Sequence, residues 1–256
     1  MQNKPAITLH KSSQIGNLNI MQLLISVTSV QEAQMALTHQ VEILDLKDPN
    51  AGALGALPFD VITEIVQYVK NQTENTTPYI SATIGDAPML PEVLVEKVER
   101  LQVTGVDYIK IGFFAADDYQ SCLNALQPIT QVGAKIIAVL FAENTYSAAL
   151  IEAIQRAGFV GVMLDTTNKN GQTLFNYYST IALAEFAEKV IKNDMMLGFA
   201  GSLKAQDVVK LKALNPTYLG FRGGVCDNFQ RQSSLNSENI RLVQNAMEFC
   251  CIKPTN

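Results

Sequence analysis

The chain has 256 residues and a formal net charge of −5 at pH 7, with 48% hydrophobic and 17% charged residues. This balance is typical of a globular protein with a sizeable core, and the acidic charge argues against a general nucleic-acid or membrane-surface role. No apolar run approaches the roughly 20 residues of a membrane span. We therefore expect a cytoplasmic protein that binds neither nucleic acid nor membrane.

The cysteine and histidine content argues against a metal site. The four cysteines form no C-x-x-C pair, and the sequence has only two histidines. A zinc site is thus not indicated, and a reducing compartment is the default setting. We expect no metal and no cofactor.

From the N-terminus onward, an extension is followed by alternating strand and helix patterns. Residues 1–20 lack the apolar core of a signal peptide and are expected to form a peripheral N-terminal extension. Short apolar runs then predict eight strands, at residues 22–27, 41–47, 78–84, 106–112, 135–141, 160–165, 195–200 and 218–222. Ser29 is suited to cap the first helix, and Pro58 and Pro91 suit the first turn of the next two. Helical patterns continue at residues 116–126, 146–157, 178–192, 204–214 and 236–250.

This alternation predicts the fold class. Near-continuous apolar strands are typical of a parallel sheet whose outer face is covered. Eight βα units in about 250 residues match an α/β (β/α)8 TIM barrel, and a doubly wound open sheet is the alternative. No linker or composition break divides the chain, so we expect residues 21–256 to form a single barrel domain.

Charged residues stand where several of the predicted strands end. Asp45 and Lys47 are two residues apart and therefore project to the same side of the second strand. Lys110 ends the fourth strand, Asp165 ends the sixth, and Lys169 follows in the next loop. The carboxyl ends of barrel strands meet at one mouth, so we favour a common catalytic site over solvated charges or structural ion pairs.

Three lysines around one cavity favour amine chemistry. Neighbouring positive charges and partial burial lower a lysine pKa, so that a neutral amine becomes available to attack an aldehyde or ketone. The resulting iminium is an electron sink for making or breaking carbon–carbon bonds, and nearby aspartates can move protons.

The loops after the last two predicted strands indicate anion binding. Gly201 and Ser202 follow the seventh strand, and Arg222, Gly223 and Gly224 follow the eighth. In barrels these two loops often hold a phosphate through backbone N–H groups, and Arg222 is suited to add a bidentate contact. Plain turns are the alternative interpretation.

Several segments together resemble a known family. The chain is similar to (5-formylfuran-3-yl)methyl phosphate synthases in the segments LLISV, ILDLKDPNAGALGA, ISATIGD, GVDYIKIG, VMLDTTNKNGQTLF, LAEF, FAGSLK and GFRGGVC. These segments span residues 21–226, and DLKDPNAGALGA and LDTTNKNGQTLF are the specific ones. The segment DNFQRQSSLNS and the N-terminal extension depart from the family pattern.

The resemblance implies a particular reaction. Such enzymes are (β/α)8 barrels that condense two molecules of glyceraldehyde 3-phosphate to 4-(hydroxymethyl)-2-furancarboxaldehyde phosphate, with loss of phosphate and water, in the biosynthesis of methanofuran or an analogue. By this resemblance Lys47 is the Schiff-base lysine, Lys110 a proton acceptor, and Asp45, Asp165 and Lys169 supporting charged residues. The expected partner is the small-molecule substrate, and whether the chain forms a homo-oligomer is left open.

Two other functions remain open at this level. One is another class I aldolase acting on a sugar phosphate, and the other is a non-catalytic barrel that binds a phosphorylated metabolite. An epimerase or isomerase is less favoured, since no histidine or glutamate base stands at a strand end.

Overall fold

The eight predicted strands are all present and close into one barrel. The computed structural model describes residues 21–72, 77–168 and 172–248. Within them eight parallel strands pair in sequence order, and the last pairs with the first. The strands are β1 (Gln22–Val27), β2 (Ile43–Leu46), β3 (Tyr79–Thr83), β4 (Tyr108–Phe113), β5 (Ile136–Phe141), β6 (Gly161–Asp165), β7 (Met196–Phe199) and β8 (Tyr218–Phe221). The (β/α)8 barrel is therefore confirmed and the open sheet is excluded.

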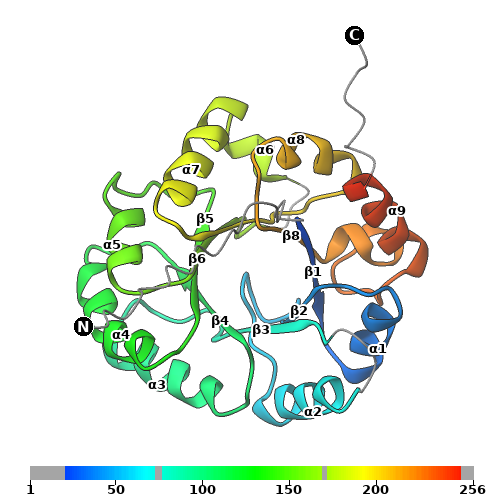
Figure 1. Cartoon of the computed structure of the whole chain (residues 1–256), viewed down its shortest axis with the longest axis horizontal. Helices are drawn as coiled ribbons and strands as arrows, with labels where there is room; N and C mark the ends of the chain where they lie inside the picture. The colour runs from blue at the N-terminus through cyan, green and yellow to red at the C-terminus, as the bar shows by residue number, and fades with distance from the viewer. Residues whose placement is uncertain (1–20, 73–76, 169–171, 249–256) are drawn as a thin grey trace, which may run out of the picture.

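The helices form an outer ring around the strands (Figure 1). They are α1 (Val30–Thr38), α2 (Phe59–Lys70), α3 (Pro91–Gln102), α4 (Gln120–Gln131), α5 (Leu150–Arg156), α6 (Leu174–Tyr177), α7 (Thr180–Lys192), α8 (Val208–Lys212) and α9 (Ser237–Glu248). Three single 3-10 turns, η1 (Ala205–Asp207), η2 (Gly223–Val225) and η3 (Asp227–Phe229), lie in the last two βα connections.

The local signals at the helix ends agree with the sequence at most positions. The Ser29 side chain accepts the N–H of Glu32 and so caps α1, and Pro91 stands in the first turn of α3. Pro58 is the N-cap of α2 rather than its first helical residue. Helix α4 begins four residues later than expected, because the Asp118 carboxylate accepts the N–H groups of its first residues.

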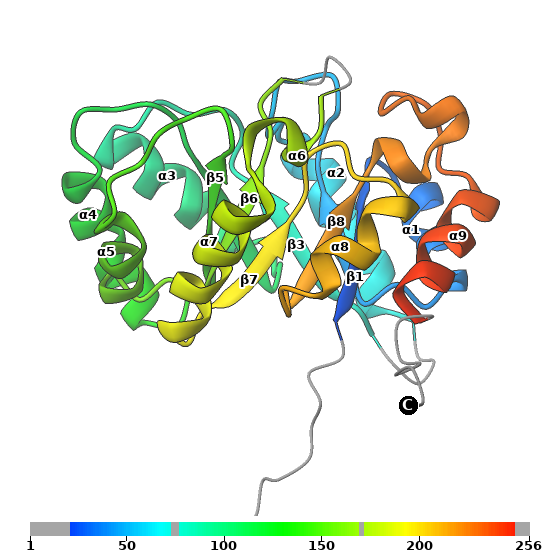
Figure 2. The same ribbon diagram turned by 90° about the horizontal axis from the view of Figure 1, so that it is seen from above.

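The strand register brings polar side chains of neighbouring strands to one level of the barrel. Ser26 of β1 is level with Asp45 of β2, which is level with Ser81 of β3. Thr83 is in turn level with Lys110 of β4. In Figure 2 the strands rise from the lower edge, where β1 begins, so their carboxyl ends form the upper rim of the barrel. The register thus gathers polar groups from distant parts of the sequence near the mouth.

Below that level the barrel interior is filled with apolar side chains. This cluster, here called the barrel floor, includes Leu24, Ile43, Tyr108, Ile137, Met163 and Tyr218. Gly198 makes room for Tyr218, since a Cβ at this position would lie 2.4 Å from the Tyr218 ring. A larger cluster packs the outer faces of the strands against the helices. The polar groups of the mouth therefore rest on a close-packed layer that excludes solvent from below.

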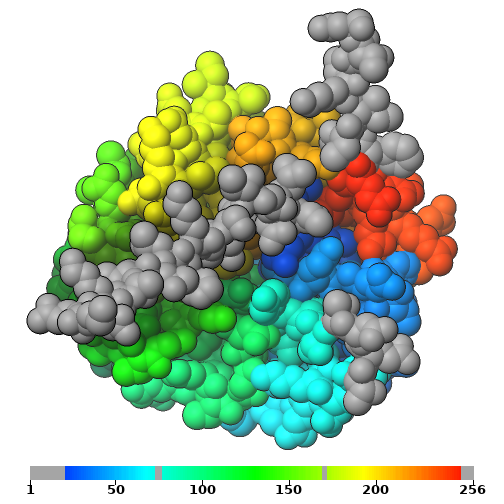
Figure 3. Space-filling model, viewed as in Figure 1, coloured from blue at the N-terminus to red at the C-terminus, as the bar shows by residue number. Residues whose placement is uncertain are grey.

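The chain closes on itself around the ring. In the space-filling view the colours follow one another until the red C-terminal helix meets the blue first helix (Figure 3). The His39 ring at the end of α1 bonds the Ser237 hydroxyl at 2.6 Å, and Gln244 of α9 donates to the His39 carbonyl. Consequently α9 is held beside the end of α1.

Candidate active site

A buried carboxylate organises the interior side of the mouth. Asp45 is 2% exposed and accepts three donors, one each from β1, β3 and β4. The Ser26 hydroxyl lies 3.1 Å from one of its oxygens, and the Ser81 hydroxyl (2.7 Å) and the Lys110 amine (2.5 Å) lie close to the other. The carboxylate of Asp45 is therefore fully engaged, as a buried charge must be.

Lys110 is the more deeply buried of the two site lysines. Its residue is 1% exposed, and burial lowers the pKa of its amine below the usual value of 10.5. The charge of Asp45 opposes that decrease, whereas the positive charge of Lys47 adds to it. Lys110 is thus an amine held close to a carboxylate in a place that disfavours its protonated form.

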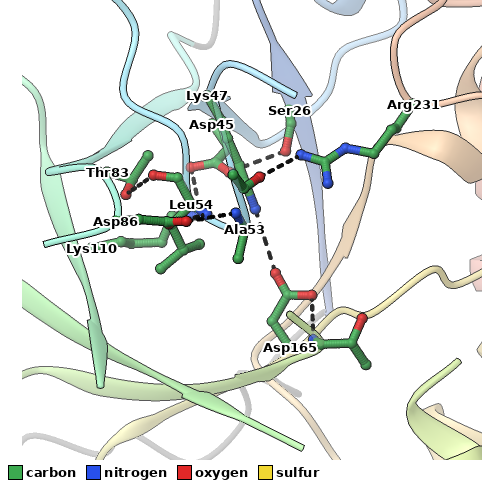
Figure 4. A network of polar contacts seen from close by, with 12 residues as sticks. Ser26, Asp45, Lys47, Ala53, Leu54, Thr83, Asp86, Lys110, Asp165 and Arg231 are labelled. Carbon is green, nitrogen blue, oxygen red and sulfur yellow. Dashed lines mark hydrogen bonds and ion pairs between the residues drawn. The ribbon is translucent and has the colours of Figure 1, made fainter. Parts of the chain in front are cut away.

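Lys47 faces the cavity from the end of β2. Its amine lies 3.5 Å from an oxygen of Asp165, which is the last residue of β6 on the other side of the barrel (Figure 4). The second Asp165 oxygen accepts the backbone N–H of Thr166 at 2.7 Å, which fixes the carboxylate. The mouth therefore contains two lysine–aspartate pairs, one inside the barrel and one at the cavity surface.

The loop after β2 is shaped by a close contact with Asp86. The Asp86 carboxylate accepts the N–H groups of Ala53 and Leu54 at 2.9 and 2.7 Å. Gly52 adopts a φ of +97°, and a Cβ there would lie 2.1 Å from an Asp86 oxygen. The segment DPNAGALGA thus needs its glycine so that the loop can close over the carboxylate.

The two glycine-containing loops offer free backbone donors to the cavity. Ser202, Leu203, Gly223 and Gly224 line the cavity. Within the described residues none of their backbone N–H groups donates to a protein acceptor. The loops lie against each other, since a Cβ on Gly224 would be 2.2 Å from the Leu203 carbonyl oxygen. Free N–H groups on packed loops are what an anion site requires.

Arg222 departs from the expected phosphate contact. All five of its N–H donors are taken by protein oxygens: two bonds reach the Glu32 carboxylate, and the others reach the carbonyls of Ser26, Ser233 and Arg231. The expectation of a bidentate phosphate contact is corrected accordingly, because this guanidinium has no donor left. Arg222 instead joins β8 to α1 and to the segment that follows.

The cavity at the mouth has a volume of about 670 Å³. That volume lies within the range of roughly 300–1,000 Å³ typical of small-molecule sites. Asp45, Lys47, Lys110 and Asp165 all line it, together with Gly201 and the two glycine loops. Lys169 lies outside the described residues. The structure thus brings together four of the five expected charged residues and the expected glycine loops.

Three cationic residues of the cavity, Lys204, Lys210 and Arg231, were not anticipated from the sequence. Arg231, ten residues past the end of β8, lines the same cavity and points toward the strand-end charges (Figure 4). No periodicity or glycine pattern marks its position.

No group of three or more His, Cys, Asp or Glu side chains in the described part of the chain is placed to hold a metal ion. None of the described helices is both long and apolar enough to cross a membrane.

Comparison with known proteins identifies the family of the chain. The family model described as 4-HFC-P synthase matches residues 23–244. A Methylorubrum extorquens protein, which carries the name (5-formylfuran-3-yl)methyl phosphate synthase as a provisional assignment, is 36% identical over 88% of this chain and 91% of its own. The (5-formylfuran-3-yl)methyl phosphate synthase of Methanococcus maripaludis strain C6 is 31% identical over 89% of this chain and 98% of its own.

A solved structure adds support for the fold alone. KGPDC from Streptococcus mutans, in complex with D-R5P, superposes with a TM-score of 0.63 at 11% identity, over 90% of this chain and 98% of that one. The family assignment rests instead on the sequence matches, which cover almost the entire barrel. The chain belongs to the 4-HFC-P synthase family.

Proposed function

We propose that the protein condenses two molecules of glyceraldehyde 3-phosphate to 4-(hydroxymethyl)-2-furancarboxaldehyde phosphate through a Schiff base on Lys47, in the biosynthesis of methanofuran or an analogue. The observation that carries the proposal is the double lysine–aspartate arrangement at the mouth. Lys47 presents its amine at the cavity surface, 3.5 Å from Asp165. Lys110 is held inside, 2.5 Å from Asp45.

The first step requires an aldehyde placed next to a neutral amine. The glycine loops supply backbone N–H groups suited to hold the substrate phosphate. The Lys47 amine then attacks the carbonyl carbon, and water leaves as the iminium forms. Asp165, fixed by the Thr166 N–H, is placed to balance the iminium charge and to carry protons during dehydration.

The second step uses the iminium as an electron sink. Removal of a proton next to the iminium carbon gives an enamine, whose carbon attacks C3 of the second molecule once that molecule has lost its phosphate by elimination. Lys110 is suited to accept that proton, because burial lowers the pKa of its amine and so favours the neutral form. The C2 oxygen of the second molecule then closes the ring on the iminium carbon, which releases the Lys47 amine, and loss of water yields the furan.

Borohydride trapping with glyceraldehyde 3-phosphate tests this assignment. The wild-type adduct should map to the peptide that contains Lys47, and incubation without borohydride should produce a furan ultraviolet chromophore. Lys47→Ala and Lys47→Arg should both lose the adduct and nearly all turnover, since alanine has no amine and an arginine stays protonated. Lys189→Ala, on the exposed face of α7, is the matched control and should behave as wild type.

Three outcomes would contradict the proposal. An adduct on Lys110 would exchange the roles of the two lysines. An adduct without a furan product would indicate another Schiff-base aldolase. Tight binding of the substrate with neither adduct nor product would indicate a non-catalytic barrel.

A further inference from the structure

Arg231 enters the cavity from an unexpected direction. Its backbone lies beside the glycine loop after β8, since a Cβ on Gly223 would be 3.7 Å from the Arg231 nitrogen. One terminal N–H group of its side chain donates to the Gly52 carbonyl of the loop after β2 at 3.0 Å. The residue therefore links the segment after β8 to the loop after the lysine-bearing second strand, which lies two strands away around the barrel (Figure 4).

The guanidinium of Arg231 retains unused donors. Among the described residues its only side-chain hydrogen bond is the one to Gly52, and no ion pair joins it to a carboxylate. Arg222, the other arginine at this end of the barrel, has all five donors occupied by protein oxygens. Because a guanidinium carries five N–H donors, Arg231 has four to offer to a ligand.

The electrostatic setting also favours an anion next to Arg231. Burial lowers the pKa of its guanidinium, which shows that the charge is partly removed from water. The negative charges of Asp165, Asp48 and Asp86 oppose this decrease, whereas the positive charge of Arg222 adds to it. A partly desolvated cation without an ion-pair partner gains free energy when an anionic ligand supplies one.

The proposed reaction places two phosphate groups in one cavity. The glycine loops provide one cluster of N–H donors, which suits one phosphate. The second molecule, which must meet the covalently held first molecule beside Lys47, brings a second phosphate that needs a separate cation. We propose that Arg231 contacts the substrate and binds the phosphate of this second molecule. The inference rests on the proposed function and adds a residue specific for the second molecule.

The test separates binding of the first molecule from reaction with the second. In Arg231→Gln the borohydride adduct on Lys47 should form as in wild type, whereas kcat/KM for furan formation should fall about 10- to 100-fold, the effect expected from loss of a charge-assisted hydrogen bond. Arg231→Lys keeps the charge but not the planar fork and should lie in between. Arg241→Gln, an exposed arginine of α9, is the control and should leave both measurements unchanged.

Calorimetric titration with inorganic phosphate gives a readout that does not depend on catalysis. Wild type should bind two phosphates per chain and Arg231→Gln one. If wild type gives neither adduct nor furan, the proposed function fails, and the phosphate count still decides whether Arg231 forms an anion site. The inference is overturned if Arg231→Gln binds as much phosphate as wild type, if it loses the Lys47 adduct together with the product, or if furan formation is unchanged. A melting temperature equal to that of the Arg241 control shows that the fold is intact.

Discussion

Replacing Asp45 by asparagine should destabilise the protein strongly and make its stability depend on pH. The substitution keeps the size of the side chain and removes the one negative charge that pairs with the buried Lys110 amine. Breaking a buried ion pair from one side costs about 3–5 kcal/mol, because the Lys110 amine must then either stay charged without a partner or give up its proton. For a chain of 256 residues this corresponds to a decrease of roughly 6–20 °C in melting temperature.

The pH dependence follows from the direction of the Lys110 pKa. Burial lowers this pKa in the folded chain below its usual value of 10.5. At pH values between the folded-state and the unfolded-state pKa, the folded chain therefore binds fewer protons than the unfolded chain. The free energy of unfolding therefore rises with pH across that window. Asp45 raises the Lys110 pKa, so its loss lowers the folded pKa further. The pH range over which the free energy of unfolding rises should thus begin at a lower pH in Asp45→Asn than in wild type.

Urea unfolding at several pH values measures both effects. Asp117→Asn, which removes an exposed carboxylate, is the control and should change the free energy of unfolding by less than about 0.5 kcal/mol. The double variant Asp45→Asn with Lys110→Met should recover part of the loss, since it removes the stranded charge. The reasoning is refuted if Asp45→Asn is no less stable than the Asp117 control, or if the double variant is less stable than the sum of the two single changes.

Two further changes test the structural roles assigned to residues near the site. Arg222→Met should lower the free energy of unfolding by about 3–5 kcal/mol, because it leaves the part-buried Glu32 carboxylate without its ion-pair partner. Adding Glu32→Met should recover part of that loss. If Arg222→Met instead keeps full stability and binds phosphate more weakly, Arg222 is a phosphate ligand after all. Tyr218→Phe should leave the free energy of unfolding unchanged or raise it by up to about 1 kcal/mol, because the buried Tyr218 hydroxyl has no hydrogen-bond partner among the described residues. A clear loss of stability in thermal unfolding would show that this hydroxyl is satisfied.

The sequence predicted the strands well because a parallel sheet covered on its outer face requires apolar runs. All eight strands were found, and the charged residues that ended those runs are the ones that meet at the mouth. The start of α4 was predicted four residues too early. The Asp118 carboxylate accepts the N–H groups of Gln120 and Ser121 and so fixes the start of the helix after a short loop. The four-residue helix α6, closed by a capping box between Thr173 and Asn176, was too short to give a periodic signal.

The roles of the two arginines could not be read from local pattern. Arg222 was correctly placed at the end of a strand, but its partner Glu32 lies 190 residues earlier in the chain. Only the closed barrel, which sets β8 beside β1, brings the two together. Arg231 was missed because its position depends on the path of an irregular segment, and no spacing rule describes such a path.

The contact between Gly224 and the Leu203 carbonyl has a consequence for engineering new substrate preferences onto this barrel. The backbones of the loops after β7 and β8 touch where a single added methyl group would not fit. Neither loop can therefore be lengthened, or exchanged for one from another barrel, without displacing the other. Grafting experiments that aim at a different phosphorylated substrate should therefore replace the loops after β7 and β8 together. Libraries that vary only one of these loops should yield mostly inactive proteins.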